Sequence, residues 1–487
     1  MKLRFDPAEQ ERFWDAIRRI PGYPVGDQIP LKTMLIESGA LFRLPPVLDA
    51  LSEKSQGEVL VVMDPTPMRR GSDSLKPLVL DVLRNAGWQP NTLVLEPDSS
   101  GQVHTDMPHI EWVKARIQAG SPVVSVGSGV VTDIAKHACY LYEKETGIAI
   151  PYVVYQTANS VSAYTSDMAP VFIEGVKRTL PSRYPDALIS DLETLRDAPR
   201  EMTVAGVGDL LAAFVSFPDW YLAHQLGMDP KYTELPHALM DGMEELFLSN
   251  AEEIRLRSLP GMALLAKLIH LAGLAMSLSH ATTPLSGYEH VMSHILDLHN
   301  EQAGMPLAQH GSQVALTTIL GSMAYEAFLD QFEPAEVVVE RCFPNAERIR
   351  LHILNEFAKI DPSGKAGEEC WSDYRVKLER WSEQGSSLEG ILANWPQIKQ
   401  RLQTLARPHE TTLRILQAVE APTNFEALIP PISESSAKFA FFNAPLMRYR
   451  FTLGDMLIFL NWDREALWER IWKSLNPPPS PPRPSSS

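Results

Sequence analysis

The stretch VGSGVVTDIAK, residues 126–136, decides the fold, because two glycines join an apolar run to an amphipathic helical pattern there. The run before it, SPVVSVGSG (121–129), is typical of a buried strand. Gly127 and Gly129 would let the backbone turn sharply and approach a phosphate, and the helix that follows offers free N–H groups. The turn is therefore a candidate pyrophosphate cradle. Its spacing differs from GxGxxG. Glycines between a strand and a helix equally often form only a tight turn that binds no ligand.

Three further apolar runs extend this pattern outward: GEVLVVMD (57–64), NTLVLEPD (91–98) and IPYVVYQT (150–157). Each is apolar on both faces and is separated from the next by a helical pattern. Strands of this kind predict a parallel sheet that is covered by helices on both sides.

The pattern changes after about residue 190, where long helical segments replace the strands. We expect an α/β domain at 1–196 with a parallel sheet and a Rossmann-like nucleotide site, and an all-α domain at 197–475. The Pro/Ser-rich segment 476–487 is predicted to be a disordered tail.

Composition narrows the class of protein. The 487 residues carry 44 Lys and Arg against 60 Asp and Glu, a net charge of −16, which argues against a protein that coats nucleic acid. Three distant cysteines suggest neither a disulfide framework nor a thiolate zinc site. An acidic N-terminus without a signal peptide, and no apolar run approaching a membrane span, predict a cytoplasmic protein without a membrane partner.

Asp64 ends the apolar run 57–64. A carboxylate in this position can accept hydrogen bonds from an adenosine ribose and repel a 2′-phosphate, which would favour NAD over NADP. The alternative is a strand-end Asp that only shapes a turn.

Histidines in the second half suggest a metal site. His290 and His294 are four residues apart and share one face of a predicted helix, His310 begins another helical run, and Asp209 is expected in the first turn of a third. One carboxylate and two neutral imidazoles would leave a divalent ion an open coordination position. Among thirteen histidines, however, accidental pairs and buried structural imidazoles are common.

Five blocks in a fixed order resemble one family. The chain is similar to the sn-glycerol-1-phosphate dehydrogenases, particularly their bacterial branch, within the superfamily of dehydroquinate synthase, glycerol dehydrogenase and iron-containing alcohol dehydrogenases. The resemblance extends from about residue 36 to residue 457 and implies a dehydroquinate synthase-like fold. The blocks are VGSGVVTDIAK, YQTANSVSAYTSDMAPV, GVKRTLPSRYPDALISDLETLRDAPREMTVAGVGDLLA, GLAMSLSHATTPLSGYEHVMSHILD and HGSQVA.

The resemblance also implies roles for individual residues. Asp209, His290 and His310 would bind one divalent metal, most commonly zinc or nickel, and Asp209 and His294 would face the substrate as catalytic residues. Family members commonly form homodimers or larger oligomers. The nicotinamide cofactor, NAD or NADP, would contact Gly129, Val130, Val131, Thr132, Asp133, Thr157, Asn159, Ser160 and Ser166.

Four departures from the family pattern bear on the substrate. Ser162-Ala163 replaces an Asp-Gly pair, Gln156 replaces a Pro, Val130 a Thr or Ser, and Ser312 the Glu of HGEQ. Loss of the Asp carboxylate would remove an acceptor for substrate hydroxyls, an effect of about 1–3 kcal/mol.

The leading hypothesis is metal-dependent hydride transfer between NAD(P)H and a small phosphorylated ketone, with dihydroxyacetone phosphate giving sn-glycerol-1-phosphate, a step of phospholipid metabolism. Three alternatives stay open: a different polyol or sugar phosphate, a cyclase of the dehydroquinate synthase type, and a degenerate homologue that binds nucleotide or metal without catalysis.

Overall fold

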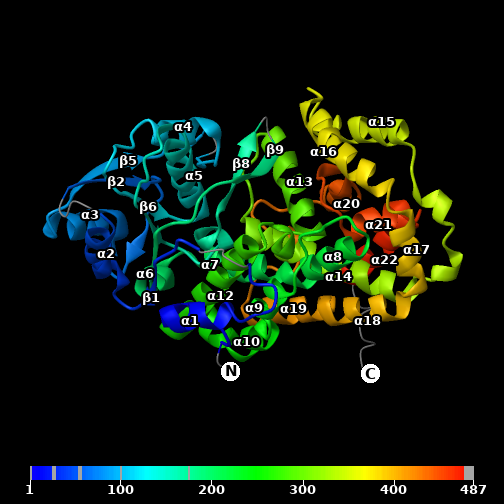
Figure 1. The fold of residues 1–487 in the computed structure, drawn as a ribbon, viewed down its shortest axis with the longest axis horizontal. Helices are drawn as coiled ribbons and strands as arrows, with labels where there is room; N and C mark the ends of the chain where they lie inside the picture. Colours follow the sequence, from blue (N-terminus) through cyan, green and yellow to red (C-terminus); the bar gives the residue numbers. More distant parts are fainter. Residues whose placement is uncertain (1–2, 25–28, 53–56, 99–100, 174–175, 477–487) are drawn as a thin grey trace, which may run out of the picture.

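Six parallel strands form a sheet at one end of the molecule (Figure 1). The computed structural model describes residues 3–24, 29–52, 57–98, 101–173 and 176–476. The strand order is β1-β10-β7-β6-β2-β5. The strands are β1 (Thr33–Glu37), β2 (Glu58–Met63), β5 (Gln89–Val94), β6 (Val123–Gly127), β7 (Tyr152–Gln156) and β10 (Ala187–Asp191).

Alternate residues of β2 pack into two different cores. Val59 and Val61 contact the cluster under α2 (Leu44–Leu51) and α3 (Leu75–Asn85), while Leu60 and Val62 contact the cluster that includes α4 (Met107–Lys114) and α5 (Gly129–Thr146). The sheet is therefore covered on both faces, as the apolar runs predicted.

The predicted fold class is confirmed, with two strands added. The four predicted runs form β2, β5, β6 and β7, while β1 and β10 pair in parallel at one edge of the sheet. β5 lies at the other edge and only its Leu93 is buried, so the prediction of a buried strand is wrong for this run. An antiparallel hairpin, β8 (Met168–Ile173) and β9 (Val176–Pro181), leaves the sheet and lies beside α13 of the helical half (Figure 1). A second short pair joins β3 (Arg69–Arg70) to β4 (Asp73–Ser74).

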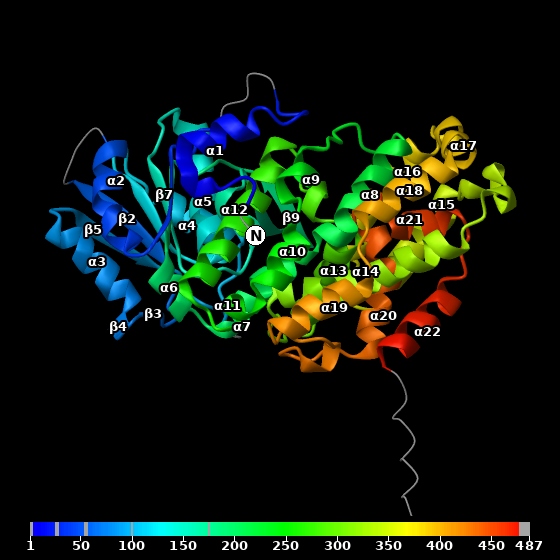
Figure 2. The same cartoon turned by 90° about the horizontal axis from the view of Figure 1, so that it is seen from below.

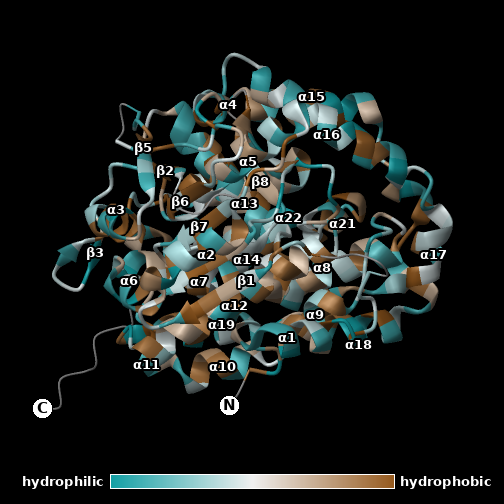
Figure 3. Cartoon of the chain, turned by 60° about the vertical axis from the view of Figure 1, so that its left-hand side comes forward, coloured by the Kyte–Doolittle hydropathy of each residue, from teal (hydrophilic) through white to brown (hydrophobic). Residues whose placement is uncertain are grey.

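Helices make up the second half of the described chain, beside the sheet in both views (Figures 1 and 2). Hydrophobic residues concentrate on interior helices such as α12, and the outer helices mix both kinds (Figure 3). A short helix α1 (Gln10–Ile17) precedes the sheet. The others are α6 (Leu192–Asp197), α7 (Arg200–Leu211), α8 (Ala213–Gln225), α9 (Leu235–Met240), α10 (Met243–Ser249), α11 (Ala251–Arg255), α12 (Leu259–Leu278), α13 (Tyr288–Gln302), α14 (His310–Gln331), α15 (Ala346–Phe357), α16 (Lys365–Trp381), α17 (Gly385–Ala393), α18 (Trp395–Leu405), α19 (His409–Ala418), α20 (Glu434–Asn443), α21 (Leu453–Phe459) and α22 (Arg464–Leu475).

The last strand ends at Asp191, a few residues before the expected boundary at 196/197, which stays a prediction. Two helical stretches, Arg200–Gln225 and Leu259–Leu278, have the length and apolarity of a membrane span, but 89% and 83% of their apolar windows are buried inside the protein. Buried core helices also have this length and apolarity. The predicted tail at 476–487 lies outside the described residues except for Asn476.

Candidate metal centre and cofactor cleft

A cleft of about 410 Å³ lies between the sheet and the helical half. One wall is the start of α5, where Ser128, Gly129, Val130 and Val131 line the space. Asp209, His290, His294 and His310 of the helical half line the same cleft. The glycine-rich turn and the imidazoles, which are far apart in the sequence, therefore face one cavity.

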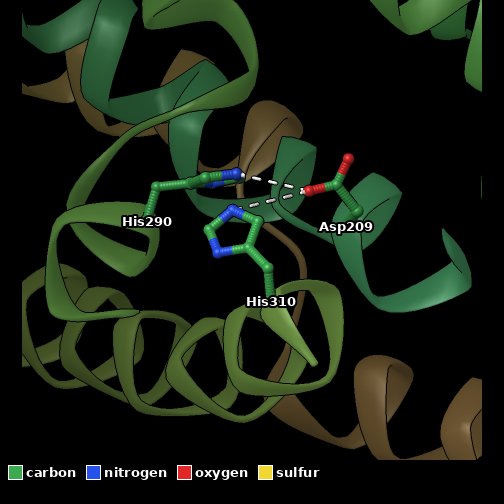
Figure 4. A group of neighbouring side chains, drawn as sticks. All are labelled: Asp209, His290 and His310. Carbon is green, nitrogen blue, oxygen red and sulfur yellow. Dashed lines mark ion pairs between the residues drawn. The ribbon is translucent and has the colours of Figure 1, made fainter. Parts of the chain in front are cut away.

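Asp209, His290 and His310 converge on one point (Figure 4). Their ligand atoms all lie within 4.8 Å of one another. Asp209 Oδ1 is 3.5 Å from His290 Nε2 and 4.0 Å from His310 Nε2. One carboxylate oxygen and two imidazole nitrogens in this arrangement fit a divalent cation of the zinc or nickel type.

The remaining polar atoms of the three side chains are held by neighbours. His290 Nδ1 donates to Glu289 Oε1 at 3.0 Å, and Ser293 Oγ lies 3.3 Å from His310 Nδ1. Asp209 Oδ2 accepts a hydrogen bond from the Ser162 N–H at 3.1 Å. These contacts leave His290 Nε2, His310 Nε2 and Asp209 Oδ1 available for a shared partner. Hydrogen-bonding neighbours orient the ligands of metal sites in the same way.

Close packing of α7 against α14 places Asp209 beside His310. Asp209 lies in the last turn of α7, so the prediction of a place in the first turn of a helix is wrong. A Cβ on Gly208 would fall on the carbonyl oxygen of Gly311, and a Cβ on Gly311 would fall on that of Ala205. The two backbones approach this closely only because both positions are glycine. Asp209 and His310 each follow or precede one of these glycines, so their side chains lie side by side at the contact between α7 and α14.

Burial keeps two of the imidazoles neutral. It lowers the pKa of His310 and of His294 well below the usual value, and the Lys177 charge acts in the same direction on both. Burial also acts to lower the pKa of His290, but hydrogen bonds to Asp209 and Glu289 outweigh it and raise that pKa to about 8. Only neutral imidazoles bind a metal, so His290 would have to lose a proton for an ion to bind here.

The residues expected to contact the cofactor fall into two groups. Seven of them line the cleft, two on the loop after β7 and the others on or near the strand ends and the start of α5. They are Asp64, Gly129, Val130, Val131, Asp133, Ser160 and Ser166.

The other four lie behind the cleft wall. Asn159 Nδ2 donates to the Met262 carbonyl at 3.1 Å and fixes the loop to α12. The Thr132 and Thr157 hydroxyls are buried without a hydrogen-bond partner among the described residues. A Cβ on Gly127 would collide with Val131, so this glycine is required by packing.

Asp64 lies on the cleft, but its carboxylate is already engaged. Lys76 Nζ contacts Oδ1 in an ion pair, and the Thr66 hydroxyl donates to Oδ2 at 2.6 Å. The neighbouring cation weakens the argument that Asp64 alone would exclude a 2′-phosphate.

Sequence reasoning missed Lys177, on β9. It is the only Lys or Arg among the described residues that line the cleft, and its Nζ is 3.7 Å from Asp297 Oδ2. The hairpin carries this charge across to the helical half. The stretch VKRTLP lacks the apolar alternation that marks a strand, so the sequence offered no signal for its position.

The fold and the cleft together define a class of protein. A family model described as iron-containing alcohol dehydrogenase matches residues 35–199. The structure is similar to an alcohol dehydrogenase from Oenococcus oeni, with a TM-score of 0.56 at 13% identity, covering 91% of this chain and 99% of that one. The architecture is therefore that of the iron-containing alcohol dehydrogenases.

Sequence relatives narrow the class to one family. The chain is 30% identical over 281 residues to glycerol-1-phosphate dehydrogenase [NAD(P)+] of Pyrococcus abyssi, covering 57% of this chain and 73% of that protein. It is 26% identical over 436 residues to the Geobacillus stearothermophilus protein of the same name, covering 89% and 93%. The chain belongs to the glycerol-1-phosphate dehydrogenase family, whose members are NAD(P)-dependent oxidoreductases.

Proposed function

We propose that this chain reduces dihydroxyacetone phosphate to sn-glycerol-1-phosphate with NADH or NADPH, at a divalent metal held by Asp209, His290 and His310. The observation that carries the proposal is the convergence of these three groups on the cleft that the start of α5 also lines. Bound in this cleft, a cation supplies Lewis-acid polarisation of a substrate oxygen, and the reduced nicotinamide supplies hydride.

The side chains around the cleft suit such a substrate. Lys177 offers a positive charge for the phosphate, and its ion pair with Asp297 is long, at 3.7 Å, so a phosphate dianion can compete for the ammonium group. His294 lines the cleft, and its Nδ1 has no hydrogen-bond partner among the described residues. A neutral imidazole in this position can transfer a proton to or from the substrate oxygen. The free N–H groups at the start of α5 suit the cofactor pyrophosphate.

The metal and the reaction are tested together with His290→Ala. We expect the variant to lose its bound metal, measured by elemental analysis, and to oxidise NADH with dihydroxyacetone phosphate at least about 10³-fold more slowly, because several kcal/mol of charge stabilisation disappear. His299→Ala, on the same helix but outside the cleft lining, is the matched control. Full turnover in metal-free His290→Ala would refute the assignment.

Substrate choice is the point at which Ser162 matters. Its N–H is bound to Asp209 and it lines the cleft, next to the metal ligands, where the family pattern has a carboxylate. Because Ser162 lacks that carboxylate, the second assay is a panel of phosphorylated ketones and polyols, which identifies the preferred substrate. Net NADH oxidation separates a dehydrogenase from a cyclase, which would reduce and reoxidise its cofactor within one turnover.

Lys177→Ala tests the phosphate contact. We expect the KM for dihydroxyacetone phosphate to rise about tenfold or more and metal content to stay unchanged, since a buried charge-assisted contact contributes about 1.5–3 kcal/mol. An unchanged KM would remove Lys177 from the substrate site. A cytoplasmic location and a homodimer remain parts of the proposal that rest on the family resemblance and composition.

A further inference from the structure

A second cavity, of about 640 Å³, lies among the C-terminal helices. It is open to solvent and is lined by the start of α15, by α21 and by the turn that leads into α22. Figure 1 places these elements at the end of the molecule opposite the sheet. The cavity shares no lining residue with the cofactor cleft among the residues that the structure describes.

The lining of this cavity is positive in a protein of net charge −16. It contains Arg341, Arg348 and Arg464 beside the imidazole of His352, and no Asp or Glu among the described residues. A surface with an excess of carboxylates supplies few such places by chance. The concentration of guanidinium groups in one concavity therefore indicates a site for an anion.

None of these three arginine side chains forms an ion pair among the described residues. In the described part of the chain, Arg341 and Arg348 make no side-chain ion pair or hydrogen bond. Arg464 Nη1 donates to the Phe442 carbonyl at 2.8 Å, and its Nε and Nη2 find no acceptor among the described residues. Arg350, two residues after Arg348, is by contrast within 3.6 Å of both Glu347 and Glu368 and does not line the cavity.

The start of α15 adds to the positive field. Pro344 and Asn345 line the cavity, and the Asn345 side chain caps the helix by accepting from the Arg348 N–H at 3.0 Å. The other free N–H groups of the first turn and the helix dipole favour an anion at this end. Burial is the largest cause that lowers the pKa of His352, Glu356 opposes it, and Arg464 and Arg348 lower it further.

Most of the remaining wall is apolar and aromatic. Ile349, Leu446, Phe459 and Trp462 belong to it. A cavity with guanidinium groups on one side and an apolar wall on the other suits an organic anion better than a bare ion. We propose that this cavity is a second binding site, separate from the catalytic cleft, for a small soluble molecule that carries a phosphate monoester.

In this site the phosphate faces the arginines, because guanidinium groups bind phosphate oxygens in pairs of parallel hydrogen bonds. The organic part lies along Trp462 and Phe459. Occupancy would tie α15 to the turn before α22, two elements that otherwise meet around an open space.

The test measures the stoichiometry and the affinity of phosphate binding. Inorganic phosphate and, separately, glycerol 2-phosphate are titrated calorimetrically, at constant ionic strength, into wild type, Arg348→Ala, the double variant Arg341→Ala/Arg348→Ala, and the control Arg350→Ala. Phosphate bound in the cleft is common to all four proteins. We expect wild type and Arg350→Ala to bind one more equivalent than the double variant, and Arg348→Ala to bind that equivalent at least about tenfold more weakly.

Both arginines are exposed, so circular dichroism should be unchanged in every variant. Equal stoichiometry and affinity in all four proteins would overturn the proposal. A second arm measures sedimentation with phosphatidic acid vesicles. Binding to the vesicles that is lost in the double variant, without any difference in soluble phosphate, would assign the cavity to a lipid headgroup and would also overturn it.

Discussion

At the scale of single residues, we expect the pair Asp64 and Lys76 to set the preference between the two nicotinamide cofactors. The carboxylate would repel a 2′-phosphate, and the ammonium group in contact with it offsets that charge. We predict that Lys76→Ala shifts the ratio of kcat/KM values toward NADH by roughly fivefold, since the net contribution of such an ion pair is about 1 kcal/mol. Steady-state kinetics with both cofactors measure the ratio. Arg84→Ala on the same helix should leave it unchanged, and an equal ratio in Lys76→Ala would contradict the prediction.

Glu289 acts through its neighbour. Its Oε1 accepts from His290 Nδ1 at 3.0 Å and from the Gly287 N–H at 2.7 Å, while Oε2 is buried without a partner among the described residues. Glutamine can keep the first contacts but removes the negative charge that would make His290 a stronger metal ligand. We predict a metal affinity lowered by about 10–100-fold in Glu289→Gln, measured by competition with a chelating dye. Glu301→Gln, on the same helix and away from the ligands, should bind metal like the wild type.

At the scale of secondary-structure elements, one buried ion pair joins α16 to α21. Lys377 Nζ is 2.6 Å from Asp455 Oδ1, and both side chains are fully buried. Asp455 also forms the capping box of α21 with Thr452. Lys377→Met leaves this carboxylate unpaired, so we predict a loss of about 3–5 kcal/mol in the free energy of unfolding, measured from the urea midpoint.

Lys359→Met provides the matched control for that prediction. Lys359 pairs with Glu356 on exposed α15, and its removal should cost less than about 1 kcal/mol. Similar urea midpoints for the two variants would show that the buried pair contributes no more than the exposed one.

The elements also show what the sequence could predict. The run around Gly127 is apolar throughout and ends in a helix, so the local pattern indicated β6 and α5. The register of Asp209 beside His310 depends on Gly208 and Gly311, about a hundred residues apart, whose contact no local pattern reveals. The resemblance supplied this grouping instead.

The strands that were missed have a physical reason too. β9 carries Lys177 in a polar stretch that pairs only with β8, so its place depends on a partner and not on burial of its own residues. β1 is one of the two edge strands, and the alternation in TMLIE is short. Behind the cleft, Asn159 and Thr157 occupy positions that family likeness assigns to the cofactor, yet their side chains pack inward.

At the scale of the whole molecule, buried histidines link stability to pH. His270 on α12 is fully buried, and its Nε2 contacts Gln156 Oε1 of β7 at 2.9 Å, which connects the helical half to the sheet. Burial lowers the pKa of His270 to about 3, and burial with the Lys136 charge lowers that of His137 on α5 to about 4. Both stay neutral in the folded protein under mildly acidic conditions.

The sign of the effect follows from proton uptake. Between the ordinary histidine pKa of about 6.5 and these lowered values, the unfolded chain binds a proton at each position and the folded protein does not, so acid favours unfolding. We predict that the free energy of unfolding falls below pH 6.5 by up to about 1.4 kcal/mol per pH unit for each histidine, about 2 kcal/mol each by pH 5. Urea midpoints at pH 7.5, 6 and 5 measure the slope. His270→Gln keeps a donor for Gln156 and removes one titrating group, so its slope should be shallower by one histidine's share. Parallel curves for the variant and the wild type would mean that His270 is protonated in the folded state, and the contact between α12 and β7 would then have to accommodate a charge.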